Sequence, residues 1–146
     1  MIIAERKPME ELKQTTAPYK KLLLAGCGTC VTVCWAGGEK EVGILASQLR
    51  LARGTEGKDH AILEATVERQ CEKEMAEELR SKVAEVDAVL SLACGIGVQT
   101  MAEIFDMPTS LSACDTGGSN LIFSGGSQAG SGLGRCQYGE FQKDPF

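Results

Sequence analysis

The residues of this chain best suited to chemistry are its cysteines. Seven occur in 146 residues, and Cys27, Cys30 and Cys34 lie within eight consecutive positions. Cysteine thiolates ligate iron–sulfur clusters and zinc, and closely spaced cysteines on a glycine-containing loop supply several ligands at once. The stretch Met1–Lys7 lacks the apolar core of a secretory signal, so we expect a cytoplasmic protein. Because disulfides do not persist in that compartment, the spacing indicates metal or redox chemistry.

A fourth ligand must come from elsewhere in the chain, and Cys71 and Cys94 are the candidates. Three interpretations stay open on spacing alone: a [4Fe–4S] cluster, a structural zinc site, and unligated thiols that are either buried or redox-reactive. Cys114 and Cys136 are expected to be spare thiols. With His60 as the sole histidine, histidine-rich metal sites are excluded, and we identify no set of catalytic residues.

The elements that must position these thiols follow from hydrophobic periodicity. Short apolar runs predict strands, and apolar residues at helical spacing predict helices. The predicted strands cover residues 20–26, 61–67, 88–93 and 108–113. The predicted helices cover residues 8–16 and 37–53, with two more marked by Met75, Leu79 and Val83 and by Val98, Met101, Ala102 and Phe105. Strands that alternate with helices predict an α/β fold, with a small parallel sheet covered on both faces.

Four cysteines lie at or just beyond the carboxyl ends of the predicted strands. They are Cys27, Cys71, Cys94 and Cys114. Parallel strands end at a common edge, where such sheets bind ligands, so we expect these thiols to converge there.

A change in composition divides the chain into an α/β domain, residues 1–116, and a C-terminal arm, residues 117–146. Eight glycines and four serines occupy the 23 positions from 117 to 139, which is typical of a linker. The apolar island Leu121–Phe123 within it favours an arm that becomes ordered on a partner.

Other features carry weaker predictions. The net charge of −5 and the absence of a basic run argue against nucleic acid, and no apolar stretch is long enough to span a membrane. We interpret Trp35 as a core residue, with shielding of a cluster as the alternative, and residues 39–41 as a solvated first turn of a helix. Glu68 and Arg69 are expected to form an ion pair, either buried beside Cys71 or on the surface.

The motifs around the cysteines resemble a known family. They are GCGTCVTVC followed by AGGEKEV at residues 26–34 and 36–42, ATVERQC at 65–71, and LSLACGIGVQ at 90–99. Over roughly residues 1–105 the chain is similar to the MetV-type small subunit of methylenetetrahydrofolate reductase, also described as the reductase C-terminal domain family. Longer members carry a further cysteine-rich segment that this chain does not match.

The resemblance implies an iron–sulfur electron-transfer subunit in the one-carbon metabolism of the Wood–Ljungdahl pathway. Its partners would be a flavin-containing catalytic subunit and further electron-transfer subunits, and the chain itself would be a non-catalytic subunit. The implied ligands of a [4Fe–4S] cluster are Cys27, Cys30, Cys34 and Cys71, with Cys94 as the alternative fourth ligand. The alternative function is a zinc-binding structural or assembly subunit of the same reductase.

Overall fold

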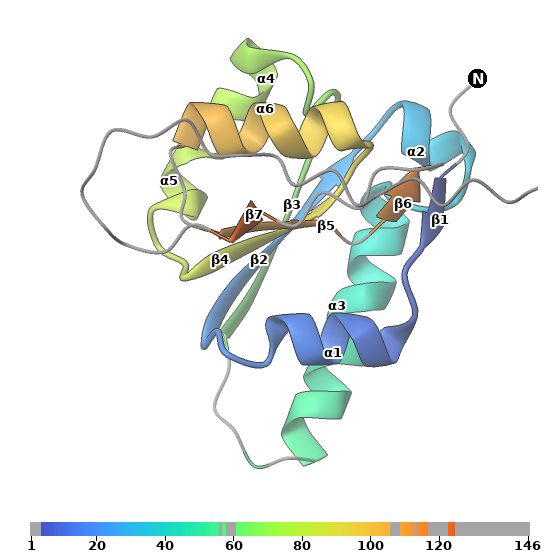
Figure 1. Ribbon diagram of the computed structural model, residues 1–146, viewed down its shortest axis with the longest axis vertical. Helices are drawn as coiled ribbons and strands as arrows, with labels where there is room; N and C mark the ends of the chain where they lie inside the picture. Colours follow the sequence, from blue (N-terminus) through green and yellow to red (C-terminus); the bar gives the residue numbers. More distant parts are fainter. Residues whose placement is uncertain are drawn as a thin grey trace, which may run out of the picture.

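The computed structural model describes residues 4–55, 57, 61–105, 109–112, 114–116 and 123–124. Its main sheet has the strand order β3-β2-β4-β5-β7, and helices cover both faces (Figure 1). The strands are Lys21–Cys27 (β2), Ala61–Val67 (β3), Ala88–Leu92 (β4), Thr109–Ser112 (β5) and Phe123–Ser124 (β7). The predicted α/β fold, with a parallel sheet and alternating helices, is confirmed.

β2 is the central strand of the parallel part of the sheet. It pairs with β3 along its whole length, from Lys21 opposite Ala61 to Cys27 opposite Val67, and with β4 on its other side. β5 extends the sheet in parallel beyond β4, and β7 adds an antiparallel strand. Every β2 residue after the first is buried, as expected for a strand covered on both faces.

The strand order contains a topological switch. From β2 the chain crosses to β3 on one side, whereas from β4 it crosses to β5 on the other. The switch therefore lies between the carboxyl ends of β2 and β4, which is where open α/β sheets have their ligand-binding crevice. Cys27 is the last residue of β2, and Cys94 follows β4 by two residues.

Two hydrophobic clusters hold the layers together. On one face Met9–Thr16 (α1) and Glu39–Thr55 (α3) contribute Leu12, Val42, Leu45, Ala46 and Leu49 to a cluster with alternate residues of the sheet. The other face is covered by Lys73–Glu77 (α4), Arg80–Val83 (α5) and Gly95–Phe105 (α6), which contribute Ala76, Val83 and Met101. Figure 1 shows α1 and α3 on the opposite side of the sheet from α4, α5 and α6.

The structure adds elements that the sequence did not predict. The helix marked by Met75, Leu79 and Val83 is divided into α4 and α5, and the loop after β2 contains a short helix, Cys30–Val33 (α2). Ala4–Arg6 (β1) pairs antiparallel with Cys114–Thr116 (β6) in a separate two-stranded sheet. The rest of the predicted arm, residues 117–122 and 125–146 with Cys136, lies outside the described residues.

Polar side chains close the amino end of the sheet. The Asp87 carboxylate accepts hydrogen bonds from the backbone N–H groups of Lys20 and Lys21, at 3.2 and 2.8 Å. The buried Arg53 guanidinium donates to the carbonyls of Thr16 and Tyr19, at 2.7 and 3.4 Å. These bonds hold the connection between α1 and β2 in place at this end of the sheet.

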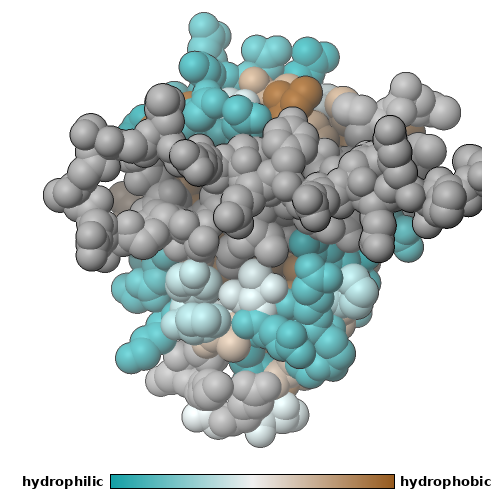
Figure 2. Space-filling view, in the orientation of Figure 1, coloured by the Kyte–Doolittle hydropathy of each residue, from teal (hydrophilic) through white to brown (hydrophobic). Residues whose placement is uncertain are grey.

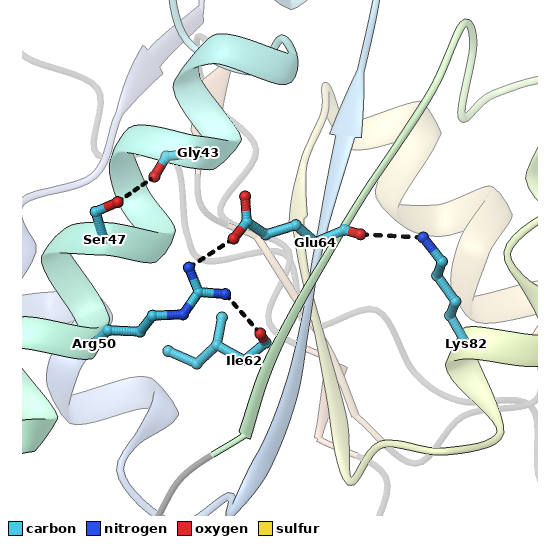
Figure 3. A network of polar contacts seen from close by, with 6 residues as sticks. All are labelled: Gly43, Ser47, Arg50, Ile62, Glu64 and Lys82. Atoms are coloured by element: carbon cyan, nitrogen blue, oxygen red, sulfur yellow. Dashed lines mark hydrogen bonds and ion pairs between the residues drawn. The ribbon is translucent and has the colours of Figure 1, made fainter.

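The outer edge of β3 is covered from both faces of the sheet (Figure 3). Arg50 of α3 donates to the Ile62 carbonyl at 2.8 Å, and Lys82 of α5 donates to the Glu64 carbonyl at 3.1 Å. Arg50 also pairs with the Glu64 carboxylate at 2.7 Å. Carbonyls two residues apart point to the same side of a strand, so the two cations occupy positions that a further strand would need.

Figure 2 shows hydrophilic residues over much of the face in view and a hydrophobic group at the end where α4 and α6 lie. Within the part of the chain that the structure describes, none of the helices has the length and apolar character needed to cross a bilayer.

Candidate metal centre

Cys27 lies at the base of the loop that follows β2, and it is buried. Its backbone N–H donates to the Gly37 carbonyl at 2.9 Å, and its carbonyl accepts from the Thr32 hydroxyl at 2.9 Å. Its thiol lies 3.8 Å from the Glu68 carbonyl and 3.7 Å from the Thr29 hydroxyl. The loop therefore closes on itself around Cys27, with the sulfur directed toward the segment that follows β3.

The same loop is attached to both neighbouring strands. Next to Cys27, the Gly28 N–H donates to the carbonyl of Val67, the last residue of β3, at 2.9 Å. At the other end of the loop, Gly37 lies against β4, where an added Cβ would overlap the Leu92 carbonyl oxygen. Only glycine fits so close to a backbone oxygen, so Gly37 lets the loop lie across the switch between β2 and β4.

Cys30 and Cys34 are placed by α2, which ends in a Schellman motif. The Trp35 N–H donates to the Thr32 carbonyl and the Ala36 N–H to the Val31 carbonyl, both at 3.0 Å. Cys30 is the first residue of the helix and Cys34 follows its last, so the two thiols lie on one side of α2, a turn apart. Cys30 is exposed, and Cys34 is partly buried.

Trp35 occupies an unusual backbone position in that motif. Its φ of 59° lies in the left-handed region, which usually belongs to glycine at this position of a helix end. The side chain is 74% exposed, and the Lys40 ammonium lies 5.6 Å from the ring centroid. The interpretation of Trp35 as a core residue is therefore wrong, because the left-handed turn directs the indole away from the sheet. Left-handed backbone at a bulky residue costs about 1–2 kcal/mol, and such strain is found at functional sites.

Cys71 lies in the turn after β3, four residues beyond Val67. Burial is the largest cause that raises the pKa of its thiol above the ordinary value, and the neighbouring Cys27 thiol is the next. Cys94 and Glu72 raise this pKa further, against a lowering by a backbone hydrogen bond. The backbone of Cys71 lies beside the first turn of α6, because a Cβ added at Gly97 would lie 3.8 Å from the Cys71 nitrogen.

Cys94 connects β4 to α6, where its carbonyl accepts the first helical hydrogen bond from the Val98 N–H at 3.1 Å. Cys34 and Cys94 are both partly buried and pack against the hydrophobic cluster that contains Cys27. The placement of Cys27, Cys71 and Cys94 at the carboxyl edge of the sheet is as predicted. That their thiols bind one group together stays a prediction. Cys114 begins β6, two residues after β5, and its side chain lies outside the described part.

The donors that gather at this edge are thiols. Thiolate sulfur is the ligand that iron–sulfur clusters and structural zinc both use, so the residue types fit either group. Within residues 4–55, 57 and 61–105, no three cysteine, histidine or carboxylate side chains are grouped tightly enough to hold a single metal ion. Cys30 and Cys71 are the exposed members of the predicted ligand set, whereas Cys27 is buried and Cys34 is partly buried.

The polar residues around Cys71 differ from the prediction. Arg69 lies 3.8 Å from Glu72 on the surface, and Glu68 contributes its backbone carbonyl rather than its carboxylate to the site. The residue that sequence reasoning missed is Gln70, which is completely buried. A signal for it exists, since Gln70 and Cys71 are the two uncharged residues in the otherwise charged run from Glu68 to Glu74.

The prediction for residues 39–41 is correct for two of its three members. Glu39 and Lys40 are exposed, whereas Glu41 is buried and its carboxylate accepts a hydrogen bond from the Gly38 N–H at 3.0 Å. This contact caps the start of α3 and fixes the end of the cysteine loop to that helix.

Three exposed apolar side chains lie on the segments that also carry Cys30, Cys34 and Cys94. Val33 and Trp35 on the loop after β2 are 78% and 74% exposed, and Ile96 at the start of α6 is 64% exposed. All three belong to segments that follow the carboxyl ends of β2 and β4, so this edge combines thiols with apolar surface.

Comparison with protein-family models, with curated proteins and with solved structures found no match to this chain. The chemistry of the site therefore rests on its own residues.

Proposed function

We propose that this protein is an iron–sulfur electron-transfer subunit that partners a flavin-containing methylenetetrahydrofolate reductase in one-carbon metabolism. The observation that carries the cluster is the placement of Cys27, Cys71 and Cys94 at the carboxyl edge of the sheet, beside the loop that holds Cys30 and Cys34. Such an edge is where α/β sheets bind their ligands, and thiols are the ligands that iron–sulfur clusters require. The reductase partner and the one-carbon pathway are what the resemblance of the sequence motifs implies.

The proposed ligands of a [4Fe–4S] cluster are Cys27, Cys30, Cys34 and Cys71, with Cys94 as the alternative fourth ligand. A bound cluster accepts and releases single electrons. The chain's own contribution is to hold the thiols and to exclude water from Cys27 by burial, because solvent access sets the polarity around a metal site. We propose that the chain is a non-catalytic subunit and that the flavin-containing partner carries out the reaction.

The exposed residues Val33, Trp35 and Ile96 support a docking role for this edge. Electron transfer requires close approach of two redox groups, and exposed apolar patches mark protein interaction sites. The strained backbone of Trp35 fits this role, since glycine would form the same turn without the strain and without presenting an indole.

Metal analysis of the protein purified without oxygen tests the cluster. We expect about four irons and four sulfides per chain, as a cubane cluster contains, and we expect Cys30→Ser to lose most of the iron. The matched control is Cys136→Ser, which removes a thiol predicted to be spare. Stoichiometric zinc without iron would overturn the cluster and favour the structural subunit. Cluster loss in Cys94→Ser but not in Cys71→Ser would identify Cys94 as the fourth ligand.

The partner is tested with Trp35→Gly. Glycine suits the left-handed position, so we expect the variant to keep its fold and its iron while binding to the flavoprotein subunit weakens at least about tenfold, as for an aromatic interface residue. Turnover of methylenetetrahydrofolate by the purified chain alone would contradict a non-catalytic subunit.

A further inference from the structure

Gln70 makes two short hydrogen bonds beneath the cysteine edge. Its amide nitrogen donates to the Ala25 carbonyl of β2 at 2.7 Å, and its amide oxygen accepts from the Ser91 hydroxyl of β4 at 2.6 Å. Gln70 and Ser91 are both 0% exposed. Ala25 and Ser91 lie opposite each other in the sheet, so one side chain spans the two strands on either side of the switch.

Each of the three segments joined in this way leads directly to a thiol. Cys27 follows Ala25 by two residues, Cys71 follows Gln70 immediately, and Cys94 follows Ser91 by three. All three cysteines lie at or just beyond the carboxyl end of a strand, on the same edge of the sheet. The hydrogen bonds thus connect the backbones that carry the three thiols at a point just below them.

Helix α6 holds the glutamine against the sheet. A Cβ added at Gly97 would lie 3.1 Å from the Gln70 Cβ and 3.8 Å from the Cys71 nitrogen, so the helix backbone passes directly over this pair of residues. A buried amide with both its groups satisfied and a helix packed over it has little rotational freedom. A hydrocarbon side chain of the same size would fill the space but would fix neither strand.

We propose that Gln70 is a positioning residue that sets the relative placement of the Cys27, Cys71 and Cys94 thiols. Its amide ties the turn carrying Cys71 to β2 through Ala25 and to β4 through Ser91. The effect of Gln70 on cluster binding rests on the proposed function. Its effect on the placement of the three thiols does not.

Crosslinking in the cluster-free full-length chain tests this placement. Dibromobimane joins two thiols that lie side by side, and peptide mass spectrometry identifies the pairs formed. We expect Cys27–Cys71 and Cys71–Cys94 pairs in the wild-type protein. In Gln70→Met, which keeps the volume and removes both hydrogen bonds, the yield of both pairs should fall about fivefold or more. The matched control Gln99→Met alters an exposed glutamine of α6 and should leave both yields unchanged.

Ser91→Ala gives a selective test that does not depend on how well Gln70→Met folds. It removes the tie to β4 and keeps the tie to β2, so the Cys71–Cys94 yield should fall while the Cys27–Cys71 yield persists. A merely structural role for Ser91 would lower both yields together. That result, or unchanged yields in Ser91→Ala, would overturn the proposal. If Ser91→Ala selectively loses the Cys71–Cys94 pair and the wild-type protein binds no iron, the positioning role of Gln70 is supported and the cluster is overturned.

Discussion

The two ends of the sheet differ in the groups that hold the backbone in place. At the amino end, Asp87 and Arg53 make charged hydrogen bonds with backbone groups from the end of α1 to the start of β2. At the carboxyl end, main-chain contacts attach the loop 27–38 to both neighbouring strands, while Cys30, Cys71 and several apolar side chains are exposed. The amino end relies on charged side chains, whereas the carboxyl end combines main-chain contacts with polar bonds from Thr32, Glu41 and Gln70.

The difference explains how a small domain presents reactive groups without losing stability. Where side chains hold the structure, they are not available for chemistry. At the cysteine end, the close contacts of Gly37 with β4 and the hydrogen bond from Gly28 to Val67 replace them. The side chains of Cys30, Trp35 and Cys71 are then left for binding. We therefore predict that the free energy of unfolding depends most on the space around backbone atoms at the carboxyl end, and on side-chain charge at the amino end.

The largest effect is expected for Gly37→Ala. Its Cβ would overlap the Leu92 carbonyl, so either the loop or β4 must move, at a cost of about 3 kcal/mol. Urea unfolding should show this loss, together with loss of the thiol pairs at the switch. Gly54→Ala is the control, because nothing lies within 4 Å of a Cβ there and the helical site should gain about 0.5–1 kcal/mol. Equal free energies of unfolding for Gly37→Ala and Gly54→Ala would contradict the importance of backbone space at the carboxyl end.

A smaller effect is expected at the amino end for Asp87→Ala. Two backbone N–H groups lose a charged but exposed acceptor, which should lower the free energy of unfolding by about 1 kcal/mol. The thiols should not respond, so iron content and crosslinking yields should match those of the wild type. Asp87→Asn keeps an acceptor oxygen and should recover part of the loss. A change in the thiols of Asp87→Ala would mean that the two ends are coupled.

The smallest effect concerns the pH response of Cys71 in the cluster-free protein. Its pKa is raised in the folded state, so the protonated thiol is favoured by folding. The resulting stability is fully present below the ordinary thiol pKa and is lost as pH rises through the raised value. Alkylation of Cys71 should therefore have its midpoint at higher pH in the folded chain than in urea. Cys27→Ser should lower the folded midpoint, and Cys94→Ser should lower it less; a midpoint that neither variant changes would contradict the grouping of the thiols.

Much of the central sheet could be predicted from sequence because its strands are short apolar runs. Residues 61–67 match β3, and the predictions for β2 and β4 differ from the structure by one residue at the ends. Pairing of β1 with β6 could not be predicted, since three-residue strands more than a hundred positions apart carry no local pattern. The division between α4 and α5 was missed because Met75, Leu79 and Val83 keep helical spacing across the turn that separates the two helices.

The cysteines of the candidate site could be predicted from the sequence, but the roles of the residues around them could not. Cysteines after successive strands indicate convergence, because parallel strands end together. The roles of Gln70 and Trp35 depend on contacts that the local sequence does not contain. Gln70 needs Ser91 on another strand, and the exposure of Trp35 follows from a left-handed turn that its residue type disfavours.

The exposed indole at the cysteine edge also gives the protein an optical reporter of its own. Trp35 is the single tryptophan of the chain, adjacent in sequence to Cys34, so all tryptophan emission originates beside the thiols. A chromophore bound there would quench that emission, and a protein surface placed over the ring would shift it to shorter wavelength. The state of the site is thus readable by fluorescence without a label and without tryptophan background from the rest of the chain.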